Sequence, residues 1–244
     1  MTLLVTFSGL DGSGKSTLIA ELKALLERRG RRVRVLTMYD DLTFFSYLRS
    51  VRDFLRGGRG RTSPKVEIDA EGNAALGGAS MAAWIYQLTR NLALREAVYL
   101  LDLLLCRLRL GYHRRIRGES VILDRYFYDS MADIAGVRDR RWYYTAEDAR
   151  QMGAGRWLYI RLLLGAAPEP SAAFFIDVPP ETAFARKQEY PLAYLQGRLE
   201  AYKRIMPLAR HPVILENRDL DSTKRRLAEL ADALAASDGG ASAP

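Results

Sequence analysis

Cysteine, histidine and long apolar runs are scarce in this sequence, and each scarcity excludes a class of protein. The single cysteine, Cys106, cannot form a disulfide within the chain, and two isolated histidines offer no Cys/His metal cluster. The most apolar stretch, residues 98–110, contains three charged residues and is shorter than the roughly 20 residues a membrane span requires. The N-terminus lacks the basic segment of a signal peptide. These features predict a cytoplasmic protein with no membrane segment.

Acidic residues are also fewer than basic ones: the chain has 29 aspartates and glutamates and 37 lysines and arginines, and its net charge is +8. A basic chain favours phosphate-bearing partners such as nucleic acid, an anionic membrane or a phosphorylated small molecule. Arginine far outnumbers lysine, and alanine and leucine are abundant. An amino-acid bias of the source genome therefore accounts for the positive net charge. Nucleic acid is therefore disfavoured as a partner.

Apolar runs and helical repeats alternate along the 244 residues, which predicts an α/β fold in a single domain. The predicted strands are residues 3–7, 33–36, 121–123, 172–178 and 213–215. Helices are predicted from residue 17 to Gly30, over 40–55 and 81–111, from Pro180, from Leu192 and after a cap at Asp221 or Ser222. Residues 57–80 form a long loop or partly ordered insertion. The alternation favours a mostly parallel sheet that binds ligands at its carboxyl end.

A phosphate-binding loop follows the first predicted strand. Residues 9–17 read Gly-Leu-Asp-Gly-Ser-Gly-Lys-Ser-Thr and fit G-x-x-x-x-G-K-[ST]. Glycines let backbone N–H groups turn toward anionic oxygens, and the following helix adds its positive end. Lys15 is expected to reach the β- and γ-phosphates and Ser16 to ligate Mg²⁺. The predicted ATP-binding residues of the loop are Gly9, Gly12, Ser13, Gly14, Lys15, Ser16 and Thr17.

Asp11 is unusual inside such a loop, because an acid repels phosphate unless it binds something else. It can hold an acceptor hydroxyl or a water on Mg²⁺, or it can be a turn residue. The first reading makes Asp11 both a catalytic and an acceptor-binding residue.

A second motif, Asp124-Arg125-Tyr126, directly follows the third predicted strand. Asp124 can hold the Mg²⁺ shell, and the planar fork of Arg125 suits phosphate. Tyr126 can stack on a base or pack beneath it. The alternative is a surface Asp–Arg pair beside a core tyrosine, which the nearby phosphate loop disfavours.

The chain resembles the thymidylate kinase family in three segments: residues 7–17, the Asp124-Arg125-Tyr126 motif and residues 175–181. The resemblance implies a P-loop NTPase three-layer sandwich with a five-stranded parallel sheet, helices on both faces and a small helical lid. It also implies ATP, Mg²⁺, a homodimer, and transfer of the γ-phosphoryl group to a nucleoside monophosphate such as dTMP. On this pattern residues 1–236 form the kinase domain, with an acceptor-side helical insertion at 40–118, a lid at 180–207 and a flexible tail at 237–244.

In this family a catalytic arginine comes from the phosphate loop or from the lid, and this loop has none. The resemblance therefore assigns the catalytic cation to Arg186 and an ATP contact to Lys187. The alternative for both is a solvated helix face.

The acceptor side departs from the family pattern, because Met38-Tyr39-Asp40-Asp41 stands where Arg-Glu-Pro is usual. Tyr39, Arg49, Arg90 and Tyr126 are the predicted acceptor contacts beside Asp11. Two other functions stay open: a kinase of a nucleoside or sugar-like molecule, and a P-loop regulatory or nucleic-acid-linked ATPase. An ordinary GTPase is disfavoured, because the chain has no Asn-Lys-x-Asp.

Overall fold

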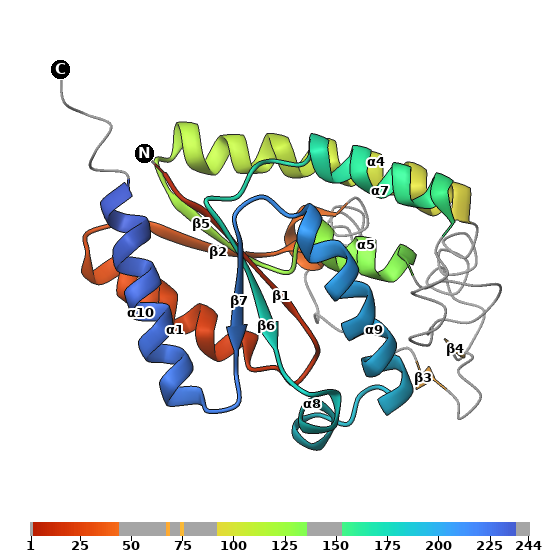
Figure 1. The fold of residues 1–244 in the computed structure, drawn as a ribbon. Coiled ribbons are helices and arrows are strands. Elements are labelled where there is room, and N and C mark those ends of the chain that lie inside the picture. The colour runs from red at the N-terminus through yellow and green to blue at the C-terminus, as the bar shows by residue number, and fades with distance from the viewer. Residues whose placement is uncertain (1, 44–66, 69–73, 76–91, 136–152, 238–244) are drawn as a thin grey trace, which may run out of the picture.

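The computed structural model describes residues 2–43, 67–68, 74–75, 92–135 and 153–237. Their centre is a five-stranded sheet in the order β2-β5-β1-β6-β7, with every neighbouring pair parallel (Figure 1). Its strands are β1 (Leu4–Gly9), β2 (Val33–Thr37), β5 (Ser120–Asp124), β6 (Ala172–Asp177) and β7 (Pro212–Glu216). The sequence-based prediction of a parallel α/β sheet is confirmed.

The central strands are apolar because both faces of the sheet are covered. Every residue of β1 is buried, and β6 is buried up to Asp177. Phe7 and Phe174 pack across these two strands with ring centroids 5.0 Å apart. Continuous apolar runs of this kind are typical of buried parallel strands.

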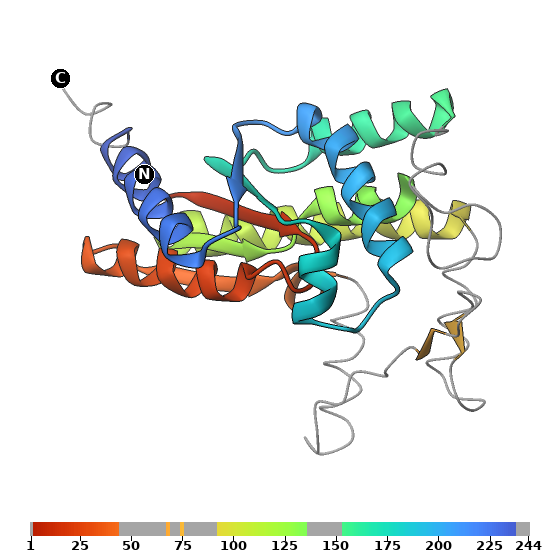
Figure 2. The same cartoon turned by 60° about the horizontal axis from the view of Figure 1, so that its bottom comes forward.

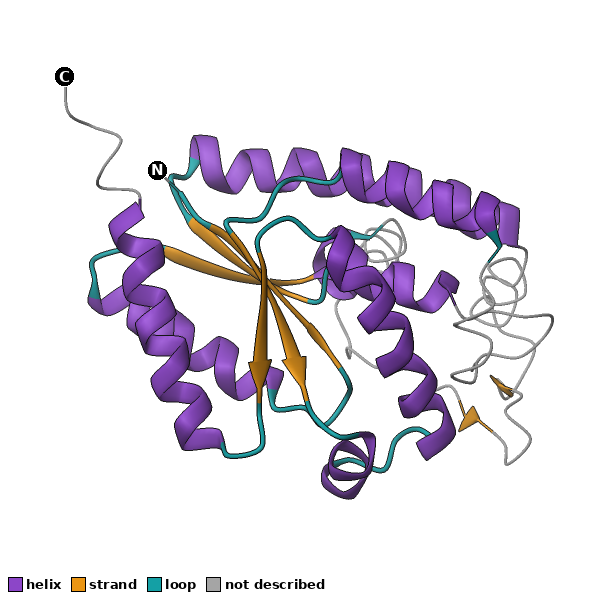
Figure 3. Ribbon diagram, viewed as in Figure 1, coloured by secondary structure: helices purple, strands orange, loops and turns teal. Residues whose placement is uncertain are grey.

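Helices form a layer on each side of the sheet (Figures 2 and 3). One layer holds α1 (Lys15–Arg28) and α10 (Leu220–Ser237), which pack on one another. The other holds α4 (Leu92–Gly111), α5 (Phe127–Ala135), α7 (Ala154–Ala166) and α9 (Leu192–Ile205). The short helix α8 (Pro180–Arg186) lies beyond the carboxyl end of β6. The three-layer arrangement predicted from the sequence is present.

Two helices and one cap differ from the sequence-based expectation. Neither α5 nor α7 was predicted. In α7, leucines lie on both the buried and the exposed side of the helix. Its sequence therefore lacks the alternation of apolar and polar faces by which a helix is predicted. The cap of α10 is Asp219, not Asp221 or Ser222: its Oδ2 accepts a hydrogen bond of 2.8 Å from the Ser222 amide. The predicted cap lay inside the first turn.

The acceptor-side segments are described only in part. After β2 the chain makes a wide helical turn, η1 (Met38–Leu42), and most of the predicted helix 40–55 lies outside the described residues. Within the predicted loop at 57–80, β3 (Glu67–Ile68) pairs antiparallel with β4 (Ala74–Ala75). The remaining helical segments are η2 (Tyr112–Ile116) and η3 (Met206–Leu208). None of the helices in the described part of the chain could span a membrane.

Candidate active site

The phosphate-binding loop joins the end of β1 to the start of α1, as the sequence predicts. Within its turn, φ is positive at Gly12 (+83°) and at Gly14 (+88°), a conformation that favours glycine. A Cβ atom at Gly12 would lie 2.4 Å from the Ala183 carbonyl oxygen of α8, and one at Gly14 would lie 2.6 Å from Nδ2 of Asn217. The loop is therefore held closely between α8 and the residue that follows β7.

Lys15 lies at the first turn of α1 and is only 7% exposed. Its Nζ donates hydrogen bonds of 2.9 Å to the Gly9 carbonyl and 2.7 Å to the Leu10 carbonyl. Burial, reinforced by the positive charge of Arg125, lowers the pKa of Lys15 to about 8, although nearby carboxylates oppose the shift. Its neighbours Ser16 and Thr17 are exposed at the mouth of the loop. The ammonium group is thus directed at the inner side of the loop.

Asp124, at the end of β5, is the residue best suited to a metal ion. Phe7 of β1 pairs with it in the parallel register, so the two strand ends lie side by side. Its Oδ1 is buried and has no hydrogen-bond partner among the described residues. Burial raises the pKa of Asp124, while Lys15 and Arg125 oppose the rise. A buried carboxylate oxygen without a donor fits a divalent cation, which prefers such ligands.

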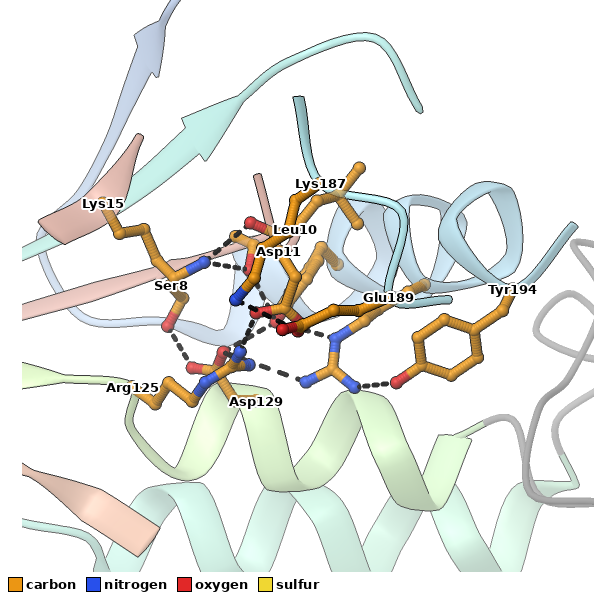
Figure 4. Close-up of polar contacts among 12 residues, drawn as sticks. Ser8, Leu10, Asp11, Lys15, Arg125, Asp129, Lys187, Glu189 and Tyr194 are labelled. Carbon is orange, nitrogen blue, oxygen red and sulfur yellow. Dashed lines mark hydrogen bonds and ion pairs between the residues drawn. The ribbon is translucent and has the colours of Figure 1, made fainter. Parts of the chain in front are cut away.

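Arg125 turns back toward the loop because its backbone adopts φ of +67°, and its amide donates a 2.9 Å hydrogen bond to the Phe7 carbonyl. Its Nη2 forms an ion pair with Asp11 (Figure 4). Burial raises the pKa of Asp11, but Arg125 and Lys15 outweigh it and the net pKa is lowered. The structure therefore brings the predicted residues Asp11, Lys15, Asp124 and Arg125 together at adjacent strand ends.

Asp129, which sequence reasoning missed, is the most connected acid of the site. It lies in the first turn of α5 and is fully buried. Its Oδ2 accepts hydrogen bonds from the Ser8 hydroxyl (2.6 Å) and the Tyr126 amide (3.0 Å), and its Oδ1 accepts one from the Tyr202 hydroxyl (2.7 Å). Arg125 approaches the same Oδ1 at 3.4 Å. The i, i+4 spacing from Arg125 was the signal in the sequence.

Arg198 of α9 is the second residue that sequence reasoning missed. It is 3% exposed and donates to the hydroxyls of Tyr194 (2.6 Å) and Tyr202 (3.2 Å). Its Nη2 also lies 3.9 Å from Oδ1 of Asp129. Helical spacing of four residues puts all three α9 side chains on one face. The buried cation on the α9 side of the site is therefore Arg198.

The two predicted lid cations lie at the end of α8, and Lys187 is close enough to Asp11 to help lower the pKa of that carboxyl (Figure 4). Arg186 and Lys187 are exposed where α8 ends. Lys187 forms a 3.0 Å ion pair with Glu189, and no hydrogen bond or ion pair joins Arg186 to the phosphate-binding loop within the described residues. The exposed position of Arg186 agrees with the alternative of a solvated helix face, whereas Lys187 lies on the Asp11 side of the site.

The predicted acceptor contacts have different outcomes. The Tyr39 ring centroid lies 5.8 Å from the Arg125 guanidinium, so Tyr39 borders the site. Tyr126 is 1% exposed, its hydroxyl donates to the Pro168 carbonyl, and its ring packs against Phe127. The burial of Tyr126 agrees with the other possibility raised by the sequence, that its ring packs beneath the base instead of stacking on it. Arg49 and Arg90 lie outside the described residues.

Asn217, also missed from the sequence, connects the phosphate-binding loop to the end of edge strand β7 and to α10. Its Nδ2 donates a 2.7 Å hydrogen bond to the Ser13 carbonyl, and its Oδ1 accepts one of 3.3 Å from Thr223 of α10. Asn217 is buried and follows β7 directly. By holding one loop carbonyl, it fixes the orientation of the neighbouring peptide units that face the phosphate site.

Known proteins with similar sequences share most of the length of the chain. A probable thymidylate kinase of Archaeoglobus fulgidus is 25% identical over 220 residues, covering 89% of this chain and 83% of the relative. A thymidylate kinase of Chlorobium luteolum is 28% identical over 211 residues (83% and 76%). One of Xanthomonas campestris pv. campestris is 29% identical over 247 residues (95% and 86%). No protein-family model matches the chain.

Proposed function

We propose that this divergent thymidylate kinase-like chain is a phosphotransferase that moves the γ-phosphoryl group of ATP to a nucleoside monophosphate such as dTMP. One observation carries the proposal: the glycine loop with buried Lys15 faces Asp124 and Arg125 at the end of the adjacent strand. Asp11 lies within the loop and pairs with Arg125, so a donor site and an acceptor-side group are in contact. The similarity to thymidylate kinases over most of the chain supports the same reaction.

On the donor side, we assign residues 12–17 to the triphosphate. Backbone N–H groups of the loop and the start of α1 bind its anionic oxygens, and Lys15 balances charge on the β- and γ-phosphates. Ser16 and Asp124 would hold Mg²⁺, the Asp124 contact direct or through water. The bound ion would neutralise phosphate charge during transfer. Lys187 already lies near Asp11 and adds positive charge to this side of the loop, whereas Arg186 would contribute only if the end of α8 moved toward the loop.

On the acceptor side, we assign Asp11 to orienting the acceptor and Arg125 to balancing charge on the moving phosphoryl group. In-line transfer needs little covalent help from the protein, so positioning and charge supply most of the rate. Tyr39 borders this side through Arg125. Arg49 and Arg90 are retained as proposed acceptor contacts.

The test is ADP formation from ATP and Mg²⁺ across a panel of nucleoside monophosphates, nucleosides and phosphosugars. We expect rapid turnover with dTMP or a related monophosphate and none after EDTA treatment. Turnover with only a nucleoside or phosphosugar would move the acceptor assignment to a biosynthetic small molecule. ATP binding without acceptor-dependent turnover, or hydrolysis stimulated by nucleic acid, would contradict the kinase assignment.

The pKa of Lys15 predicts how the reaction depends on pH. The charged ammonium binds phosphate, and its pKa is about 8, so kcat/KM for ATP should be level below pH 8 and fall about tenfold per unit above it. The measurement is kcat/KM between pH 6.5 and 9.5. In Lys15→Arg, whose guanidinium stays charged, any remaining activity should show no such fall. A level profile in the native protein would contradict this role of Lys15.

We also propose a homodimer that works in the cytoplasm. The supporting features are a row of exposed leucines on α4, at Leu100, Leu104 and Leu108, and a second row on α7, at Leu158 and Leu162. The spacing of four residues along each helix makes a continuous apolar stripe, and α4 and α7 contact one another. Apolar surface of this kind marks an interface, here with a second copy.

Charge on the leucine stripe should dissociate this dimer. We expect light scattering to give twice the chain mass for the native protein and the monomer mass for Leu104→Glu/Leu108→Glu. The control Leu25→Glu changes a half-buried leucine of α1, on the opposite side of the sheet. A monomeric native protein at micromolar concentration would contradict the proposed dimer.

A further inference from the structure

The buried carboxylate of Asp129 joins parts of the chain that are far apart in sequence. Ser8 belongs to β1, the Tyr126 amide to the turn after β5, and Tyr202 to α9, and all three donate hydrogen bonds to it. Arg125 and Arg198 approach the same oxygen, Oδ1, at 3.4 Å and 3.9 Å. A fully buried carboxylate is stable only with such donors and cations around it.

We propose that Asp129 is a positioning residue that fixes Arg125 for phosphoryl transfer and anchors α9 to the phosphate-binding strand. The inference rests on the proposed function of the site. Asp129 itself needs no contact with either substrate, because its two oxygens are already occupied by protein donors.

The two ion pairs of Arg125 use different guanidinium nitrogens, so one pair can break while the other remains. Nη2 pairs with Asp11, whereas Nη1 approaches Asp129 (Figure 4). If Asp11 turns to an acceptor hydroxyl, Nη2 is released for phosphate while Nη1 is still held by Asp129. Arg125 therefore keeps its orientation when its first partner leaves. Positioning to within about 1 Å can change the rate of such a step by about 100-fold.

The contacts of Asp129 anchor one part of the predicted lid, the helix α9. Tyr202 and Arg198 bind Asp129 from the buried face of α9, and Tyr194, Leu195 and Ile205 are buried with them. Residues 186–189, by contrast, are exposed. The contacts of Asp129 therefore hold α9 against the phosphate-binding strand, and residues 186–189 form the exposed connection between α8 and α9.

The test compares Asp129→Asn with Asp221→Asn, a matched change at an exposed position of α10. Asparagine keeps the shape of aspartate and one acceptor oxygen but removes the charge. We expect kcat to fall between about 10- and 100-fold, with KM for ATP within about twofold of the native value. Asp221→Asn should leave both constants unchanged. A folded Asp129→Asn protein with native kcat would overturn the inference.

A second pair of variants covers the case in which Asp129→Asn fails to fold. The double change Asp129→Asn/Arg198→Gln removes one charge of each sign and is compared with Arg198→Gln alone. If Asp129 positions Arg125, kcat of the double variant is at least about tenfold below that of the single variant. Equal kcat values would mean that Asp129 only pairs with Arg198 and does not position Arg125, which would overturn the inference. Absence of turnover in the native protein would contradict the proposed function instead.

Discussion

Lys15→Met should lower kcat/KM for ATP by at least about 100-fold, the loss seen when one preorganised charge or donor is removed from a transition state. The side chain is buried inside the loop, and its present acceptors, the Gly9 and Leu10 carbonyls, are uncharged. A phosphate would therefore be the stronger partner for the ammonium group. Methionine keeps the length and the apolar stem, so the change isolates the charge. Steady-state kinetics with varied ATP measure the effect.

Lys23→Met is the matched control for this loss. Lys23 lies on the same helix, its side chain is 44% exposed, and it forms a 3.7 Å surface pair with Glu27. Such a pair contributes between about 0 and 1 kcal/mol to stability, so turnover and unfolding should both stay near native. If Lys15→Met retained more than about a tenth of the native kcat/KM, the loop would not be the site of triphosphate binding.

Arg125→Met should lower both turnover and the free energy of unfolding, because Arg125 is shared by Asp11 and the fully buried Asp129. Removing the cation leaves two carboxylates with less charge compensation. Breaking a buried pair by deleting one partner destabilises proteins by about 3–5 kcal/mol. Arg198 remains 3.9 Å from Asp129 and reduces the loss, so we expect a value near the lower end. Urea unfolding gives the free energy, and ADP formation gives the turnover.

The control for Arg125 is Arg117→Met, at a position that is 57% exposed and 3.5 Å from Glu119. It should change unfolding by less than about 1 kcal/mol and leave kcat unchanged. Native stability in Arg125→Met would mean that Asp11 and Asp129 do not depend on this guanidinium. Native turnover would exclude Arg125 from balancing charge on the phosphoryl group.

The donor half of the site could be predicted because its chemistry is local in sequence. The glycines, Lys15 and Ser16 lie within one turn between a strand and a helix, and the spacing alone defines their roles. Asp124 and Arg125 were predictable for a related reason: they directly follow a buried strand, and parallel strands end at one edge of the sheet.

The rest of the site depends on contacts between distant residues, which one sequence does not reveal. Asn217 reaches Ser13 across 204 positions, and Tyr202 reaches Asp129 across 73. Arg198 lies in a helix with many polar residues, where an arginine is expected to be solvated. The resemblance to known kinases directs attention to Arg186, in the segment after β6, and not to α9. The helix α7 was missed for a simpler reason, since its leucines point both inward and outward.

The bond between Asn217 and the Ser13 carbonyl also bears on how the protein is made. The side chain that holds the Ser13 carbonyl leaves the ribosome 204 positions after Ser13 itself. Domains complete their long-range contacts only when the distant segments have emerged. A nascent chain therefore carries an incomplete phosphate-binding loop until Asn217 has emerged, and a nucleotide can assist folding of the complete loop only after that point.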